Sequence, residues 1–236
     1  LETETLAANR YFIRFDGKLS VIPASDHRTR AKNRRILTDE FLREFYVQRS
    51  FEHASFSLGR RIIVWGKTDT SAITDIVSPR DLSRFVFVEL KDARKGQFMA
   101  TATVYHDFFN TFLFISPDPA VSTLPASGTR YDRPFSVQQD AVVRKHDPAW
   151  GDVELGIRCF GTFSRLDLAF MAGRFHVNTP VFSSLQTQPD SVLVLGKQYP
   201  RFYMVGMAAA LVKNNVLLKY ELAVKKDFPL QEFDSS

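Results

Sequence analysis

The chain has 236 residues, 44% of them hydrophobic, with 22 Phe against only 2 Trp. This composition excludes a largely disordered chain and has room for one β-barrel or two small domains. The formal charge of +5 permits an anionic partner, but basic residues are spread along the chain apart from the run at 27–35, so we expect no nucleic-acid partner.

Apolar and polar residues alternate with a period of two, beginning at residues 11–21. There the odd-numbered residues form one face, while Arg14, Asp16 and Lys18 lie on the other. The same reasoning predicts further strands, in chain order, at 37–51, 54–65, 97–106, 108–116, 153–163, 165–176, 201–213 and 216–225. Many of these nine strands reach ten residues or more, which is long for a soluble sheet.

The connections between the strands alternate strictly between short and long. Short connections include the Asn214-Asn215 pair, which suits a tight hairpin with positive φ. The long connections follow residues 21, 65, 116 and 176, and they are polar and rich in Pro, Asp, Ser and Thr. Transmembrane barrels have this asymmetry, with short turns at one end and long loops at the other.

We therefore predict an all-β, antiparallel up-and-down transmembrane β-barrel, with its apolar faces toward lipid and its charged faces toward a wet lumen. The fold-level alternative is a soluble β-sandwich or lipocalin-like barrel, in which the same alternation marks a half-buried sheet. Bacterial barrels have even strand counts. Nine visible strands and a start at Leu1 lead us to expect one incomplete barrel domain over residues 1–236.

Residues 59–94 carry the most specific motif in the chain. It comprises Gly59-Arg60, Val64-Trp65-Gly66, Asp69, Asp75, the box at 78–81 and Asp92-Ala93-Arg94. With residues 147–170, this block resembles domain-of-unknown-function family 1302, a family of Gram-negative outer-membrane proteins distantly similar to alginate-export porins. The resemblance implies a barrel in the bacterial outer membrane, longer than this chain, that exports or takes up poorly soluble compounds. It also implies periplasmic or inner-membrane transport partners, and it carries over no catalytic residue.

Within this block, Trp65 is expected at the membrane–water interface, at the end of an outward-running strand. Four charged residues are predicted to structure the following loop or to constrict the pore: Asp69, Asp75, Arg80 and Asp81. Residues 81–94 are compatible with a short helix capped by Asp81. An inward fold of this loop would narrow the lumen.

The leading functional hypothesis is an outer-membrane channel for small solutes, which include hydrophobic compounds. Passage through it is either passive or coupled to a partner protein. Pore-lining candidates are Arg14, Asp16, Lys18, Glu154, Arg158, Arg165, Asp167, Lys219 and Glu221. Their mixed signs predict weak charge selectivity. The alternatives are a non-conducting docking barrel and a membrane-embedded enzyme acting on lipid or polysaccharide; the chain is expected not to be an enzyme.

Aromatic residues near the predicted strand ends are interpreted as a membrane-interface girdle, with an aromatic path for a sugar or apolar solute as the alternative. They are Tyr11, Phe41, Phe45, Tyr46, Tyr105, Phe108, Phe109, Phe202 and Tyr203. Outer-membrane lipid is the expected surrounding, and lipopolysaccharide phosphates are candidate partners of the basic run at 27–35.

Cysteine and histidine usage argues against metal chemistry. The single cysteine, Cys159, excludes an internal disulfide and a CxxC zinc site. The five histidines include no HxH or HExxH pair. We expect no metal and no cofactor, with convergence of loop aspartates on Ca²⁺ as a minor alternative.

Overall fold

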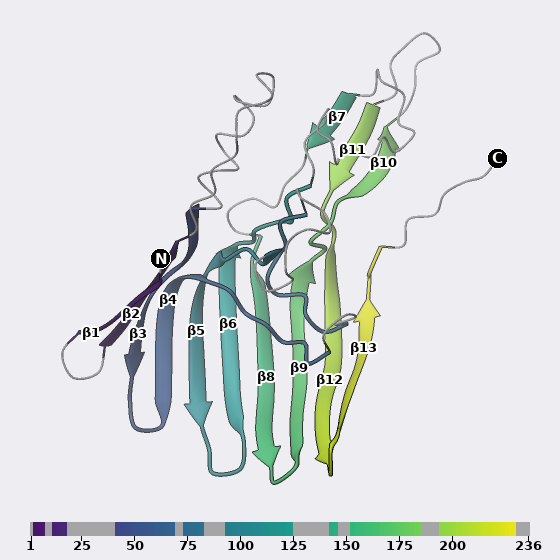
Figure 1. Cartoon of the computed structure of the whole chain (residues 1–236). Coiled ribbons are helices and arrows are strands. Elements are labelled where there is room, and N and C mark those ends of the chain that lie inside the picture. The colour runs from purple at the N-terminus through teal and green to yellow at the C-terminus, as the bar shows by residue number, and fades with distance from the viewer. Residues whose placement is uncertain are drawn as a thin grey trace.

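The computed structural model describes residues 2–7, 11–17, 41–68, 73–82, 93–124, 142–145, 152–185 and 194–229. Within these residues, ten strands form one antiparallel sheet in the order β1-β2-β3-β4-β5-β6-β8-β9-β12-β13 (Figure 1). Its strands are β1 (Glu2–Ala7), β2 (Tyr11–Gly17), β3 (Leu42–Ser50), β4 (Ala54–Arg61), β5 (Gln97–Tyr105), β6 (Asn110–Asp118), β8 (Glu154–Phe163), β9 (Leu166–His176), β12 (Arg201–Lys213) and β13 (Val216–Lys226).

The nine predicted strands all occur, and each pairs with its sequence neighbour within the predicted meander. The predicted count was too low, because β1 adds a tenth strand at one edge of this sheet. A separate three-stranded sheet was also missed; it contains β10 (Val181–Leu185), β11 (Val194–Gln198) and β7 (Val142–Lys145), with β11 and β7 parallel. Its strands have four or five residues, too few for alternation to be distinctive.

Short and long connections lie at opposite ends of the large sheet (Figure 1). Two of the short turns contain a residue in the left-handed region, Ser164 at φ 52° and Asn214 at φ 53°. Asn tolerates this region because its short side chain can bond locally. The predicted hairpin at Asn214-Asn215 is therefore confirmed.

The outer face of the large sheet is apolar and exposed. Large side chains that point outward include Phe56, Leu58, Leu113, Ile115, Leu155, Ile157, Phe170, Val205, Leu218, Leu222 and Val224. On β13 these residues alternate with Lys219 and Glu221, which face inward and are less exposed. The predicted assignment of faces is thus confirmed for β13.

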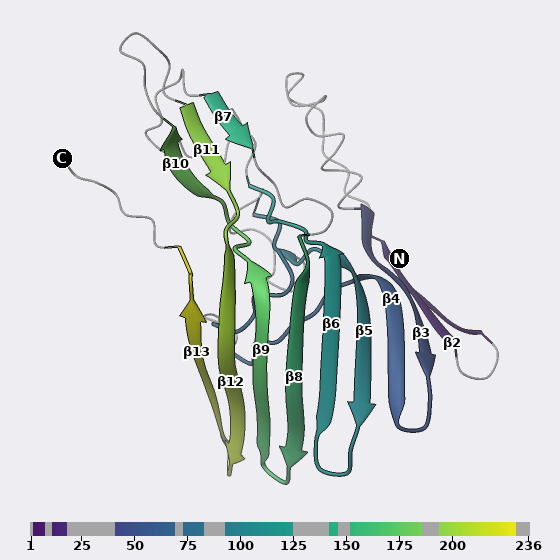
Figure 2. The ribbon, with the colours of Figure 1, turned by 180° about the vertical axis from the view of Figure 1, so that it is seen from behind.

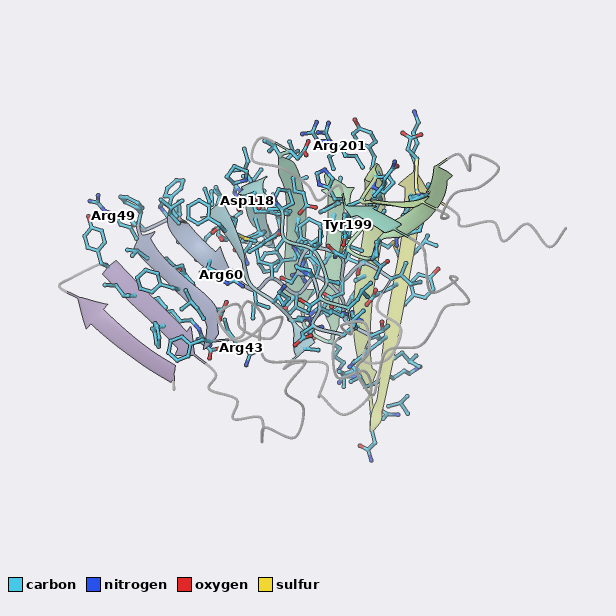
Figure 3. All side chains as sticks on the ribbon, turned by 90° about the horizontal axis from the view of Figure 1, so that it is seen from above. Arg43, Arg49, Arg60, Asp118, Tyr199 and Arg201 are labelled. Carbon is cyan, nitrogen blue, oxygen red and sulfur yellow. The ribbon has the colours of Figure 1, made fainter. Side chains whose placement is uncertain are left out.

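The sheet is curved, as the view from above shows (Figure 3). Among the described residues, β1 and β13 are its two edges, and no pairing between them closes the sheet. In the same part of the chain, no helix is both long and apolar enough to span a bilayer.

The hydrophobic core lies on the inner face, where a segment after β4 crosses back over the strands (Figure 1). We call residues 62–68 and 73–82 the inward segment. It contributes Ile63, Trp65 and Val77 to a core completed by Met99, Phe114, Ala169, Met171, Phe175, Val177, Phe202, Met204 and Ala208. Because β4 ends at Arg61, the chain that follows runs over the inner face as the inward segment, and its contacts form most of the candidate site.

Candidate functional site

Trp65 anchors the inward segment to the sheet. Its side chain is 0% exposed, and its ring contacts Phe114 and Phe175 edge-on at centroid distances of 5.6 and 5.7 Å. Gly156 makes room, since a Cβ there would lie 2.6 Å from the Trp65 ring. The expectation that Trp65 lies at the membrane–water interface was wrong, because β4 ends at Arg61 and the chain turns inward before Trp65.

Glu221 on β13 holds the far end of the inward segment. Its Oε1 accepts hydrogen bonds from the backbone N–H groups of Lys67 (2.6 Å) and Thr68 (2.7 Å) and from the Thr68 hydroxyl (2.9 Å). Its Oε2 accepts from the N–H (3.0 Å) and the hydroxyl (2.9 Å) of Thr74. One carboxylate therefore joins two parts of the segment to a strand about 150 residues away in sequence.

A second contact near Glu221 is more exposed. The Lys67 ammonium lies 3.2 Å from Asp167 Oδ2, on β9. Three of the pore-lining candidates, Asp167, Arg158 and Lys219, lie on the inner face, while Arg165 lies exposed in the turn between β8 and β9. The structure therefore places Arg165 at the short-turn end rather than along the strand wall.

Asp75 organises the returning part of the inward segment. Its side chain is 1% exposed, and its Oδ2 lies 3.3 Å from Arg80 Nη2 and 2.6 Å from Arg94 Nη2. Arg80 and Arg94 also form a backbone bridge, and Asp81 forms one with Thr123. This arrangement agrees with the predicted loop-structuring role for Asp75, Arg80 and Asp81.

Two candidates lie outside the described residues, namely Lys18 and Asp69, as does most of the helix predicted at 81–94. The basic run at 27–35 lies outside them as well.

Glu154 belongs to a buried polar cluster that sequence reasoning did not find. Its Oε1 accepts the backbone N–H of His176 at 2.7 Å and lies 3.3 Å from His176 Nδ1, while its Oε2 accepts from Gln97 at 3.2 Å. Arg201 reaches the other side of the His176 ring and pairs with Asp152. These residues come from β5, β8, β9, β12 and the residues before β8, and they meet only because β5, β6, β8, β9 and β12 pair side by side, so no local spacing could reveal them.

The inner face of β2–β5 contains a set of polar side chains that we call the polar region: Arg14, Glu44, Ser55, Ser57, Arg61, Thr101 and Tyr105. Arg14 Nε lies 2.9 Å from Glu44 Oε2. Asp16, a further lining candidate, is buried beside it and lies 3.8 Å from Arg43.

Arg61 connects the middle of the polar region. It donates to Ser57 at 2.8 Å and to Thr101 at 3.1 Å, and its guanidinium lies 4.4 Å from the centre of the Tyr46 ring. Tyr46 and Phe202 are buried on the inner face, and Tyr105 belongs to the polar region on that face, so the girdle interpretation was wrong for these three residues.

The inner face carries polar side chains that can bind a ligand, and the inward segment occupies space beside them. In the part of the chain that the structure covers, no three His, Cys, Asp or Glu side chains are grouped so that they could hold a metal ion. The inner face instead offers paired charges and hydroxyl groups beside a segment packed across half of the sheet.

Comparison with known proteins gives one family. The family described as "Protein of unknown function (DUF1302)" matches residues 8–235, nearly the whole chain. No curated protein and no solved structure matches it. On the extent of this match, the chain belongs to the DUF1302 family of proteins of unknown function.

Proposed function

We propose that this protein forms the wall of an outer-membrane β-barrel in a Gram-negative bacterium and carries small solutes across that membrane. The observation that carries the proposal is the outer face. Val205, Leu58 and Val224 are 66%, 56% and 70% exposed, and each strand of the sheet between β4 and β13 also carries an exposed apolar side chain. A surface of this extent is costly in water and is the surface that lipid requires.

The two open edges fit the same proposal. In a bilayer, every backbone N–H and C=O group needs a partner within protein, so an open edge cannot face hydrocarbon. The edges at β1 and β13 would be paired by further strands in the membrane. On this proposal the ten-stranded sheet is part of a larger closed barrel, surrounded by lipid and lipopolysaccharide.

The inner face supports solute passage with restriction. Solutes would pass along the polar region, either down their gradient or with the help of periplasmic or inner-membrane transport partners. The inward segment would narrow the lumen, because it is held near both sides of the sheet: the Ile62 N–H donates to Glu44 (2.8 Å) on β3, and residues 67, 68 and 74 donate to Glu221 on β13.

Planar-bilayer recording tests this proposal. Wild-type protein should give discrete conductance steps. Glu221→Ala should raise the single-channel conductance, because five hydrogen bonds holding the inward segment are lost. Glu52→Ala, which removes an exposed carboxylate from a short turn, is the matched control and should leave the conductance unchanged. Sealed bilayers with both wild type and Glu221→Ala would reject the channel.

The second candidate is a non-conducting docking barrel. The apolar packing of the inward segment favours it, because Trp65 and Val77 are fully buried and leave that half of the inner face closed. If the protein is such a barrel, neither the wild type nor Glu221→Ala should pass solutes across a bilayer. Partner proteins should also co-purify with it from outer membranes.

A further inference from the structure

Two cations flank a tyrosine in one register row of the outer face. Tyr203 on β12 pairs with Arg174 on β9 and with Lys226 on β13. Adjacent strands are about 4.8 Å apart, which places the backbones of the two cations about 10 Å from each other. We call these three residues the rim site.

The rim site lies at the border of the apolar surface. The next outward row toward the short turns consists of Ala172, Val205 and Val224. In the opposite direction, β9, β12 and β13 reach their long-loop ends (Figure 2). Cations therefore mark the position where the apolar outer face stops.

The side chains at the rim site retain donors for a ligand. Tyr203 is 52% exposed, and the exposed Lys226 ammonium has no ion pair or side-chain hydrogen bond within the described ranges. Arg174 donates one hydrogen bond, from Nη2 to Val153 O at 2.8 Å, and its Nε is buried, so Nη1 and the second N–H of Nη2 are the donors that it offers a ligand.

Nearby charges leave the site cationic. Arg201, exposed on the convex side of the sheet, is paired with Asp152 and adds no free charge (Figure 3). Asp227 is the nearest acid in sequence; it follows the end of β13 and forms no ion pair with Arg174 or Lys226 among the described residues.

We propose that Arg174, Tyr203 and Lys226 bind the phosphate of a membrane lipid headgroup. This inference rests on the proposed membrane location. The two cations and the tyrosine hydroxyl would donate to the phosphate oxygens, while the acyl chains lie on Val205 and Val224. Along the strands, the donors lie at the long-loop end and the apolar surface begins one row closer to the short turns. A lipid has the same sequence of a charged headgroup followed by hydrocarbon.

The other end of the sheet supplies a contrast. The Arg49 guanidinium lies 5.2 Å from the Tyr11 ring centre and 4.9 Å from that of Phe51, so two aromatic rings already engage it. Lys213, the last residue of β12, is exposed at the same end and provides a control lysine on the strand that carries Tyr203.

Native mass spectrometry of detergent-solubilised full-length protein tests the site with two lipids of equal chain length. Phosphatidylglycerol carries the phosphate and diacylglycerol does not. Arg174→Gln/Lys226→Gln should weaken phosphatidylglycerol binding about tenfold, since each basic residue near a membrane surface contributes modestly to anionic lipid binding. Lys213→Gln should bind phosphatidylglycerol like wild type, and diacylglycerol binding should not change in any variant.

Lys226→Gln alone and Tyr203→Phe provide variants at exposed positions, should the double variant fail to fold. Each should weaken phosphatidylglycerol binding more than Lys213→Gln does. Equal binding of phosphatidylglycerol by wild type and all these variants would overturn the rim site while leaving the membrane location intact. Failure of the wild type to insert into vesicles would instead reject the membrane location and the rim site together.

Discussion

The inner face of one sheet is built in two different ways. The polar region on β2–β5 contains paired charges and hydroxyl groups, as in the Ser57, Arg61 and Thr101 contacts. Over β6, β8, β9, β12 and β13, the same face is covered by the inward segment, with Trp65 and Phe175 fully buried. We call this second part the packed region.

The difference shows that strand pairing alone does not determine whether the inner face of a sheet is polar or packed with apolar side chains. Both regions have the same alternation and the same antiparallel pairing. They differ because one loop folds onto the packed region, which removes water there and makes apolar inward residues favourable. Four substitutions test this comparison, from the largest expected effect to the smallest.

Trp65→Ala should have the largest effect. Removing a fully buried aromatic side chain from a packed core costs about 3–5 kcal/mol in the free energy of unfolding. Denaturant unfolding of detergent-solubilised protein measures this loss. Leu58→Ala on the exposed outer face is the control, and its loss should be smaller because detergent or lipid refills the space. Equal losses for the two variants would show that the packed region is not a core.

Gly156→Val should come next. The added side chain would overlap the rings of Trp65 and Phe114, and such overpacking costs about 1–3 kcal/mol. The cost should shrink when Gly156→Val is made in the Trp65→Ala background, because the two positions share one space. Additive losses would contradict the contact. Ala102→Val, on the outer face, controls for added volume alone.

Thr101→Val probes the polar region. It removes a hydroxyl that lies 2.6 Å from Ser57 Oγ and accepts from Arg61, so a loss of about 0.5–1.5 kcal/mol is expected. Thr111→Val on the next strand, which points outward and whose hydroxyl has only a weak contact with Cys159 Sγ at 3.9 Å, should cost less. A loss at Thr101 as large as that at Trp65 would remove the distinction between the two regions.

Lys67→Gln should have the smallest effect, although it alters a contact of the inward segment. The ion pair with Asp167 is about one-third exposed on both sides, at 31% and 38%, and such pairs contribute about 0.2–1 kcal/mol. The difference from wild type should also diminish as salt is raised in the unfolding experiment. A salt-independent loss above this range would indicate that the pair is effectively buried.

The sequence alone determined the strand meander, the positions of the short turns and the direction of side chains such as Leu218 and Glu221. These follow from a period of two and from turn residues, which are local properties of the backbone. The sequence also carried the family resemblance, through the motif that includes Trp65.

The tertiary structure alone decided where that motif lies. Whether Trp65 lies on the outer or the inner face depends on the path of the chain after Arg61, and that path is fixed by partners such as Glu221 and Phe175 more than 100 residues away. The Glu154–His176 contact and the rim site likewise exist only once β8, β9, β12 and β13 pair in register. Such contacts arise from strand pairing and packing between distant segments, and no periodicity within a single segment encodes them.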